Sequence, residues 1–163
     1  MYQRILVPVD GSPTSTGGLD EAIRLASLVG AELRLVHVLD DIVIGSGFET
    51  AATYLHDVLP MRRKAGERIL EDARARVAAA GLTVDTVLVE NVGRRTSEIV
   101  VAQANAWHAE LIVLGTHGRR GVGRFVIGSD AEQIARMSPV PVLLVRGEPS
   151  LDDVPVGTTA PTV

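Results

Sequence analysis

The sequence predicts an α/β fold, a doubly wound three-layer sandwich in which helices cover both faces of a parallel five-stranded sheet. The first observation is a set of five short apolar, β-branched runs, at residues 5–9, 33–38, 84–89, 111–114 and 140–145. The second is that segments with helical spacing of apolar residues separate these runs. Strands that alternate with helices form parallel sheets, and strands that are apolar throughout are covered on both faces.

The four helical segments carry apolar residues three or four positions apart. They are marked by Leu19, Ile23 and Ala26; by Ile69, Leu70, Ala73 and Val77; by Ile99, Ala102 and Ala106; and by Ala131, Ile134 and Ala135. Residues typical of helix boundaries agree with this assignment. Ser12 and Pro13 are typical of an N-cap followed by a first helical residue, and Gly30 and Gly81 stand where helices should end.

Ser129 followed by Glu132 predicts a capping box for the last helix, with Ser129 as the N-cap. Prolines bear on the position of two strands, the first and the last, within the sheet. Pro8 is unfavourable within a central strand, so we expect it near the end of the first strand, where pairing gives way to a loop.

The last predicted strand is apolar from Val140 to Val145, and Pro139 and Pro141 indicate that it lies at an edge of the sheet. An exposed apolar edge needs protection or a partner. Pairing of two such edges gives a two-fold interface. We therefore predict a homodimer formed through this strand.

The 163 residues, of which 46% are hydrophobic, suit one globular domain with a full core. We expect that domain at residues 1–146, and a disordered tail at 147–163, which is rich in Pro, Thr and Asp. Three of the 20 acids lie beyond Arg146, which leaves 16 basic and 17 acidic residues in the domain. Such a balance argues against nucleic-acid binding.

The absence of cysteine excludes disulfides, zinc–thiolate sites and thiol catalysis. The start of the chain lacks the pattern of a signal peptide, and no apolar stretch approaches the roughly 18 residues of a membrane span. We therefore expect a cytoplasmic protein without membrane contact. His37, His56 and His108 lack metal-ligand spacing, which favours ordinary core or surface positions.

A glycine-rich segment after the fourth predicted strand carries the clearest chemical signal. Residues 115–129 contain five glycines, three arginines and no acid. The segment begins at the carboxyl end of a predicted parallel strand, where open α/β sheets bind ligands, and ends at a helix N-terminus, which attracts anions. It therefore predicts a phosphate-binding loop. A P-loop does not fit because Arg124 and Phe125 replace the Lys and Ser/Thr, and a dinucleotide fingerprint does not fit because Val126 replaces its third glycine.

The glycine segment resembles the ATP-binding motif of the universal stress protein family, Gly-x2-Gly-x9-Gly-Ser, read here at Gly115, Gly118, Gly128 and Ser129. Residues 7–12 (Val-Pro-Val-Asp-Gly-Ser), 35–38 (Leu-Val-His-Val) and 138–142 (Ser-Pro-Val-Pro-Val) resemble the family as well. The resemblance covers about residues 1–146. It implies an adenine nucleotide alpha hydrolase-like fold with strand order 3-2-1-4-5, a dimer through the last strand, and ATP bound with Mg²⁺.

The resemblance also implies roles for individual residues. Asp10 would contact the ribose or lie near the phosphates, Pro8 and Val9 would line the pocket, and Val38 would contact adenine through its backbone. The residues that would surround the phosphates, or belong to the same loop, are Gly115, Thr116, His117, Gly118, Arg119, Gly128 and Ser129. Whether His117 contacts phosphate or solvent stays open.

Asp130 departs from the family pattern, which commonly has an apolar residue after the motif serine. Its carboxylate would lie in the first turn of the last helix, beside the expected phosphates. Simpler interpretations also stand beside the ligand roles: the glycine segment could be a plain connection, and Asp10 could form an Asx turn with Gly11 and Ser12. The Asx turn and a ligand contact can coexist.

These observations favour an ATP-binding regulatory or sensing homodimer with at most slow turnover. Fast phosphoryl transfer needs metal ligands and a residue that positions the nucleophile, and Asp10 and Asp130 are the only acids that we expect near the phosphates. The alternative is a dimeric interaction module with a vestigial or AMP-like ligand pocket. An ATP-dependent transferase or ligase would require a second substrate site that the sequence does not indicate.

Overall fold

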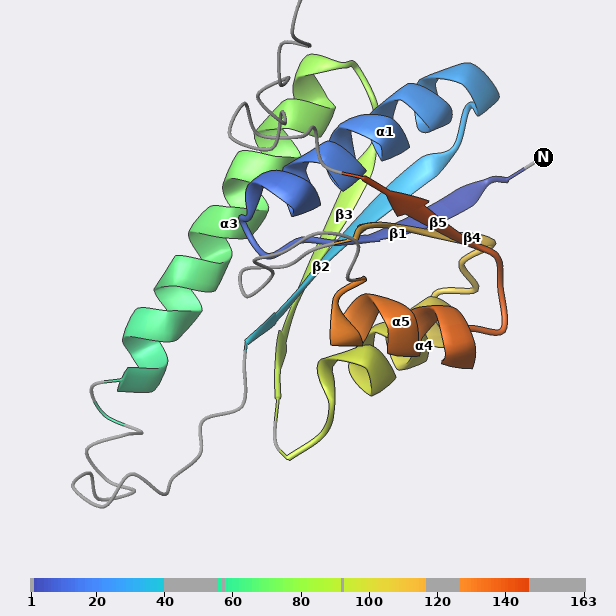
Figure 1. Cartoon of the computed structure of the whole chain (residues 1–163). Coiled ribbons are helices and arrows are strands. Elements are labelled where there is room, and N and C mark those ends of the chain that lie inside the picture. Colours follow the sequence, from blue (N-terminus) through green and yellow to red (C-terminus); the bar gives the residue numbers. More distant parts are fainter. Residues whose placement is uncertain (1, 40–55, 57, 92, 117–126, 147–163) are drawn as a thin grey trace, which may run out of the picture.

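A computed structural model describes residues 2–39, 56, 58–91, 93–116 and 127–146 (Figure 1). The order of elements is β1 (Arg4–Pro8), α1 (Pro13–Val29), β2 (Glu32–Leu39), α3 (Leu59–Ala79), β3 (Val84–Glu90), α4 (Thr96–Ala106), β4 (Leu111–Gly115), α5 (Ser129–Met137) and β5 (Val142–Val145). The strands pair in parallel in the order β3-β2-β1-β4-β5, which confirms the order implied by the family resemblance. The expected tail at 147–163 lies outside the described residues.

The two faces of the sheet are buried by different helices, as Figure 1 shows. Ile5 and Val7 of β1 pack with α1 and α3, whereas Leu6 between them packs with α4 and α5. The other central strands alternate in the same way, with Leu35 on the first face and Val36 on the second. Burial on both faces explains why the strands read as continuous apolar runs, and it confirms the doubly wound sandwich.

Capping of α1 and α3 follows the prediction. The Ser12 hydroxyl accepts a hydrogen bond from the Ser15 N–H (3.1 Å), and Pro13 is the first helical residue. Gly30 ends α1 in the left-handed region at φ 71°, and Gly81 follows α3 at φ 73°. The helix boundaries predicted from these residues are therefore confirmed.

The predicted capping box of α5 is wrong. The N-cap is Gly128, whose carbonyl accepts from the Glu132 N–H (2.9 Å), and Ser129 is already helical. The Gly128 N–H donates to the carbonyl of Thr116 (2.7 Å) at the end of β4. This bond fixes the start of the helix one residue earlier than the Ser/Glu spacing suggests, and no side chain of the described residues caps the N-terminus.

Pro8 is the last residue of β1, as predicted. The N–H of Val9 bonds to the Val36 carbonyl of β2 (2.9 Å), so strand alternation turns the nitrogen of Pro8 toward β4. The pairs between β1 and β4 are Ile5 with Leu111 and Leu6 with Ile112. Pairing thus stops before Pro8, and the missing N–H of the proline breaks no ladder bond.

The last strand is shorter than predicted, beginning at Val142 instead of Val140. The Ser138 hydroxyl donates to the Val140 carbonyl (2.7 Å) and accepts from the Val140 N–H (3.2 Å), which closes a local turn. The carbonyl of Pro141 accepts from Ile112 of β4 (3.0 Å), so the chain reaches β4 only there. β5 lies at an edge of the sheet, as predicted.

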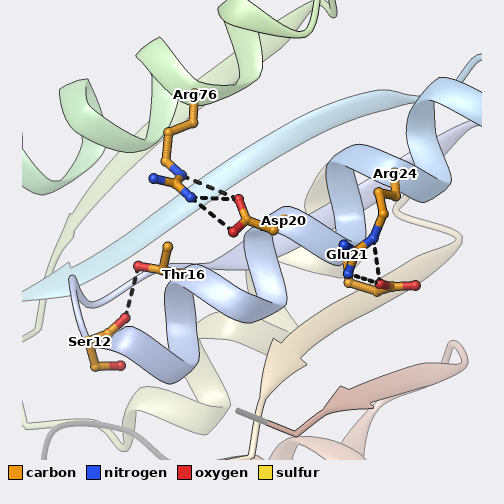
Figure 2. A network of polar contacts seen from close by, with 6 residues as sticks. All are labelled: Ser12, Thr16, Asp20, Glu21, Arg24 and Arg76. Atoms are coloured by element: carbon orange, nitrogen blue, oxygen red, sulfur yellow. Dashed lines mark hydrogen bonds and ion pairs between the residues drawn. The ribbon is translucent and has the colours of Figure 1, made fainter. Parts of the chain in front are cut away.

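The polar contacts of α1 include one that joins it to α3 and others within the helix and its N-cap (Figure 2). Asp20 of α1 accepts two hydrogen bonds of 2.9 Å from Arg76 of α3, which joins the two helices on this face. The Thr16 hydroxyl donates to the Ser12 carbonyl (3.0 Å) in the first turn. Within the described ranges, no helix is both long enough and apolar enough to cross a membrane.

Candidate functional site

The candidate site lies at the carboxyl edge of the sheet, where β1 and β4 stop pairing. β1 continues to Pro8 and β4 to Gly115, but their last pair is Leu6 with Ile112. The next elements, α1 and α5, both begin at this edge, at Pro13 and Ser129. A crevice between diverging strands, with helix N-termini beside it, is where doubly wound sheets bind ligands and where anions are stabilised.

The turn from β1 into α1 is built around Asp10, which is half-buried. Its Oδ1 accepts a hydrogen bond from the Ser12 N–H (2.9 Å), and its own N–H donates to the Ser15 hydroxyl (3.1 Å). Gly11 between them has a φ of 77°, which glycine adopts without strain. The Asx turn expected from the sequence is therefore present, and it fixes the position of the carboxylate.

His37 of β2 also contacts the residue that leads into this turn, a role that the sequence did not predict. Its side chain is buried at 7% exposure, and Nδ1 lies 2.7 Å from the Val9 carbonyl oxygen. Because a carbonyl can only accept, Nδ1 donates. His37 thereby holds the carbonyl of the residue that precedes Asp10. Its position as the one polar residue within the run 35–38 is the only sequence signal of this role.

Two glycines bring α1 into direct backbone contact with the end of β4. A Cβ on Gly115 would lie 2.2 Å from the carbonyl oxygen of Thr14, and a Cβ on Gly18 would lie 2.8 Å from the nitrogen of Gly115. Neither distance is possible, so both positions require glycine for packing. Gly115 has no positive φ, and Gly128 has a φ of −56°, so the backbone conformation itself requires glycine at neither position.

The two ends of the glycine segment meet at the end of β4. Thr116 is buried, its N–H donates to Val145 of β5 (2.9 Å), and its carbonyl accepts from the Gly128 N–H (2.7 Å). The segment therefore leaves and returns at one point, and Ser129 and Asp130 follow as exposed residues in the first turn of α5. His117, Gly118 and Arg119 lie outside the described residues.

Val38 reaches the same edge from β2. It is the next-to-last residue of that strand and is 9% exposed, so its side chain belongs to the core. The carbonyl of Val36 points toward β1 and accepts from the Val9 N–H. Because backbone groups two residues apart on a strand point to the same side, those of Val38 also point toward β1, at a level beyond its last residue. The structure thus brings Pro8, Val9, Asp10 and Val38 to the same edge as Gly115, Thr116, Gly128 and Ser129 of the glycine segment, and as Asp130, which follows the segment in the first turn of α5.

Metal binding by side chains alone finds no support at this edge. Among the described residues there is no cluster of three or more His, Cys, Asp or Glu side chains that could hold a metal ion. A magnesium ion that arrives with a nucleotide takes most of its ligands from phosphate and water, with one or two carboxylates from the protein.

Comparison with known proteins gives one family. The model of the universal stress protein family matches residues 1–146. Universal stress protein YxiE of Bacillus subtilis (strain 168) is 32% identical over 151 residues, which cover 90% of this chain and 100% of that protein.

Solved structures agree. A universal stress protein family member from Burkholderia pseudomallei is 30% identical with a TM-score of 0.69, covering 88% of this chain and 96% of the other. A universal stress protein in complex with cAMP is 29% identical with a TM-score of 0.65, covering 90% and 98%. The chain therefore belongs to the universal stress protein family and has the adenine nucleotide alpha hydrolase-like fold of its relatives.

Proposed function

We propose that this chain binds an adenine nucleotide, ATP together with Mg²⁺, at the carboxyl edge between β1 and β4, and acts as a homodimeric regulatory or sensing module. One observation carries the proposal. The β1–α1 turn, the two hydrogen-bonded ends of the glycine segment and the start of α5 all lie at the edge where β1 and β4 stop pairing. The relative solved with cAMP supports an adenine nucleotide as the ligand class.

The start of α5 is the favoured place for phosphate. The first N–H groups of a helix have no partner within the helix, and they are satisfied by a cap, by water or by a ligand. At α1 the Ser12 hydroxyl and the Asp10 carboxylate take up N–H groups of the turn, whereas among the described residues no side chain caps α5. The Gly128 N–H already donates to the Thr116 carbonyl, so a phosphate here would accept from N–H groups of the first helical turn, beginning with that of Ser129.

The other groups suit the rest of a nucleotide. Asp10 uses Oδ1 for the Asx turn, which leaves Oδ2 to accept from a ribose hydroxyl. The backbone of Val38 points past the end of β1, where it can exchange hydrogen bonds with the edge of a purine. These contacts hold and orient a nucleotide without activating a nucleophile, so we expect turnover to be slow.

A second candidate function has specific support, because the relative solved with cAMP carries a cyclic monophosphate. In this reading the chain is a dimeric interaction module whose pocket accepts AMP-like ligands and does not depend on ATP. The contribution of the β- and γ-phosphates to affinity distinguishes the ATP site from the AMP-like pocket. An ATP site gains affinity from phosphates at α5, whereas an AMP-like pocket gains none.

The test has two stages. Purified protein is denatured and the supernatant is analysed for released adenine nucleotide; nucleotide-free protein is then titrated calorimetrically with Mg-ATP, AMP and cAMP. We expect Mg-ATP to bind more tightly than AMP. Gly118→Val and Gly128→Val should abolish ATP binding, since a branched side chain would occupy the place of the phosphate. Gly17→Ala, at a position with no atom within 4 Å of its added Cβ, serves as control. Unchanged affinity in either valine variant would refute the phosphate site.

The dimer of this proposal would form through β5. Within the part of the chain that the structure describes, β5 is an edge strand; Leu143 on it is 36% exposed, and Met137 of α5 is 46% exposed. Pairing of two β5 edges would satisfy the outward backbone groups and cover these side chains.

A further inference from the structure

The opposite edge of the sheet, β3, offers a second surface that the nucleotide proposal does not use. Among the described residues, β3 pairs only with β2 and ends the sheet order on that side. The Leu33 N–H of β2 donates to the Thr83 carbonyl (3.3 Å), so alternation directs the backbone groups of Thr86 and Leu88 outward. Both residues can therefore pair with an added strand.

The charges of β3 do not protect this edge. Natural edge strands carry charged side chains that discourage pairing with other chains. Asp85 of β3 is bound to Arg34 of β2 at 2.5 Å, and Glu90 is bound to Arg63 of α3. The four residues between them, Thr-Val-Leu-Val at 86–89, carry no charge and are only half-buried.

Two carboxylates that form no salt bridge in the described part of the chain lie beside this uncharged stretch. A hollow of about 260 Å³ lies between α3 and β3, lined by Glu67, Leu70, Glu71, Thr86 and Leu88. Glu67 and Glu71 are exposed, lie one helical turn apart, and form no salt bridge within the described part of the chain, although Glu67 interacts electrostatically with Arg63, which is itself bound to Glu90. Like charges at this spacing repel each other, so a cation between them would relieve the repulsion.

We propose that the β3 edge binds an extended, basic peptide segment of another protein. The peptide adds as a further strand beside Thr86 and Leu88, and one Arg or Lys side chain enters the hollow between Glu67 and Glu71. Backbone pairing supplies affinity and the acidic hollow selects the sequence, which is the general mode of strand addition.

A second copy of this chain fits the same edge poorly. In a two-fold pair of β3 strands, each hollow would have to be filled by a side chain from the partner's β3. The strand reads Val-Asp-Thr-Val-Leu-Val-Glu and contains no basic residue. Self-pairing would therefore bring no cation from the partner strand to the four carboxylates of the two hollows.

The test uses the full chain and a fluorescein-labelled heptapeptide, Thr-Val-Thr-Arg-Thr-Val-Thr, followed by fluorescence anisotropy. We expect saturable binding, and at least tenfold weaker binding to the Glu67→Gln/Glu71→Gln and Glu67→Lys/Glu71→Lys variants. The same peptide with Glu in place of Arg should bind the lysine variant better than the wild type. Asp72→Lys, also exposed on α3 but outside the hollow, is the matched control and should leave affinity unchanged.

N-methylated peptides separate strand addition from simple charge attraction. Methylation of alternate amides on the pairing edge of the peptide should abolish binding, whereas methylation of the other amides should not. Circular dichroism confirms that each protein variant is folded. The proposal is overturned if the wild type shows no saturable binding, if the glutamine variant binds the Arg peptide as tightly, if both methylated peptides bind alike, or if the glutamate substitutions change only self-association.

Discussion

Two adjacent glycines of α1 should respond in opposite ways to the same substitution. A Cβ added to Gly17 would have no atom within 4 Å. A Cβ added to Gly18 would lie 2.8 Å from the nitrogen of Gly115 and 3.1 Å from the carbonyl carbon of Leu114. Gly17→Ala adds a methyl group where there is space, and Gly18→Ala adds one where there is none. Both substitutions reduce the freedom of the unfolded backbone alike, so their difference reports the packing around Gly18.

The magnitudes follow from helix propensity and packing. Replacing Gly by Ala within a helix stabilises it by roughly 0.5–1 kcal/mol. Forcing an extra methyl group into a packed interior costs about 1–3 kcal/mol. At Gly18 the opposing atoms are backbone atoms of β4, which cannot rotate away, so the cost should lie in the upper part of that range. We expect the free energy of unfolding to rise by about 0.5–1 kcal/mol in Gly17→Ala and to fall by about 1–2 kcal/mol in Gly18→Ala.

Urea unfolding followed by far-ultraviolet circular dichroism measures both changes, provided that the slope with urea stays the same. Gly115→Ala should be more damaging than Gly18→Ala, because its Cβ would lie 2.2 Å from the Thr14 carbonyl oxygen. If Gly18→Ala stabilised the protein as much as Gly17→Ala, the close contact of α1 with β4 would be refuted, together with the packing explanation for the first glycine of the motif.

Three further predictions concern the site and the dimer. His37→Phe removes the donor to the buried Val9 carbonyl and should lower the free energy of unfolding by about 1–3 kcal/mol, measured by the same urea titration. Leu143→Lys should give monomers in sedimentation velocity if β5 forms the dimer. Leu143 is exposed, whereas the neighbouring Val142 packs against α4 and α5, so a change at Leu143 disturbs the core less. A Leu143→Lys variant that stayed dimeric would place the interface elsewhere. Asp130→Val should slightly lower the stability of the nucleotide-free protein, since an acid in the first turn of α5 favours the helix dipole by roughly 0.3–1 kcal/mol. It should also tighten ATP binding, because a phosphate about 4 Å from the carboxylate is repelled by roughly 1–4 kcal/mol; calorimetric binding that is weaker in the variant only when Mg²⁺ is present would instead make Asp130 a metal ligand.

The fold was predictable because its main determinants are local. The apolar runs and the residues at helix boundaries each reflect a preference within a few positions of sequence, as at Ser12, Gly30 and Gly81. The start of β5 was two residues off because the pairing of Pro141 with Ile112 depends on a residue about 30 positions away. The capping box at Ser129 failed for the same kind of reason, since a hydrogen bond to Thr116 decides where α5 begins.

The location of the candidate site was also predictable, but part of its construction was not. A glycine segment after a parallel strand indicates the carboxyl edge of the sheet, and Asp10 and Val38 lie at that edge. The contact of Gly115 with Thr14 and the bond from His37 to Val9 join residues on different elements. No periodicity encodes such contacts, because they depend on how closely two elements approach in the folded chain.

Pro8 links the fold to the candidate site. It is the residue of β1 least suited to a central strand, and it lies at the edge where the candidate site is found. It lies beyond the last pair of β1 with β4, so its missing N–H breaks no ladder bond. The Asx turn at Asp10 then directs the chain into α1, and Gly18 and Gly115 let that helix lie against the backbone of β4. The opening is thus bounded by hydrogen bonds and close packing within the protein itself. Places where a sequence departs from local preference tend to be functional, and here the departure lies just beyond the last pair of the two central strands.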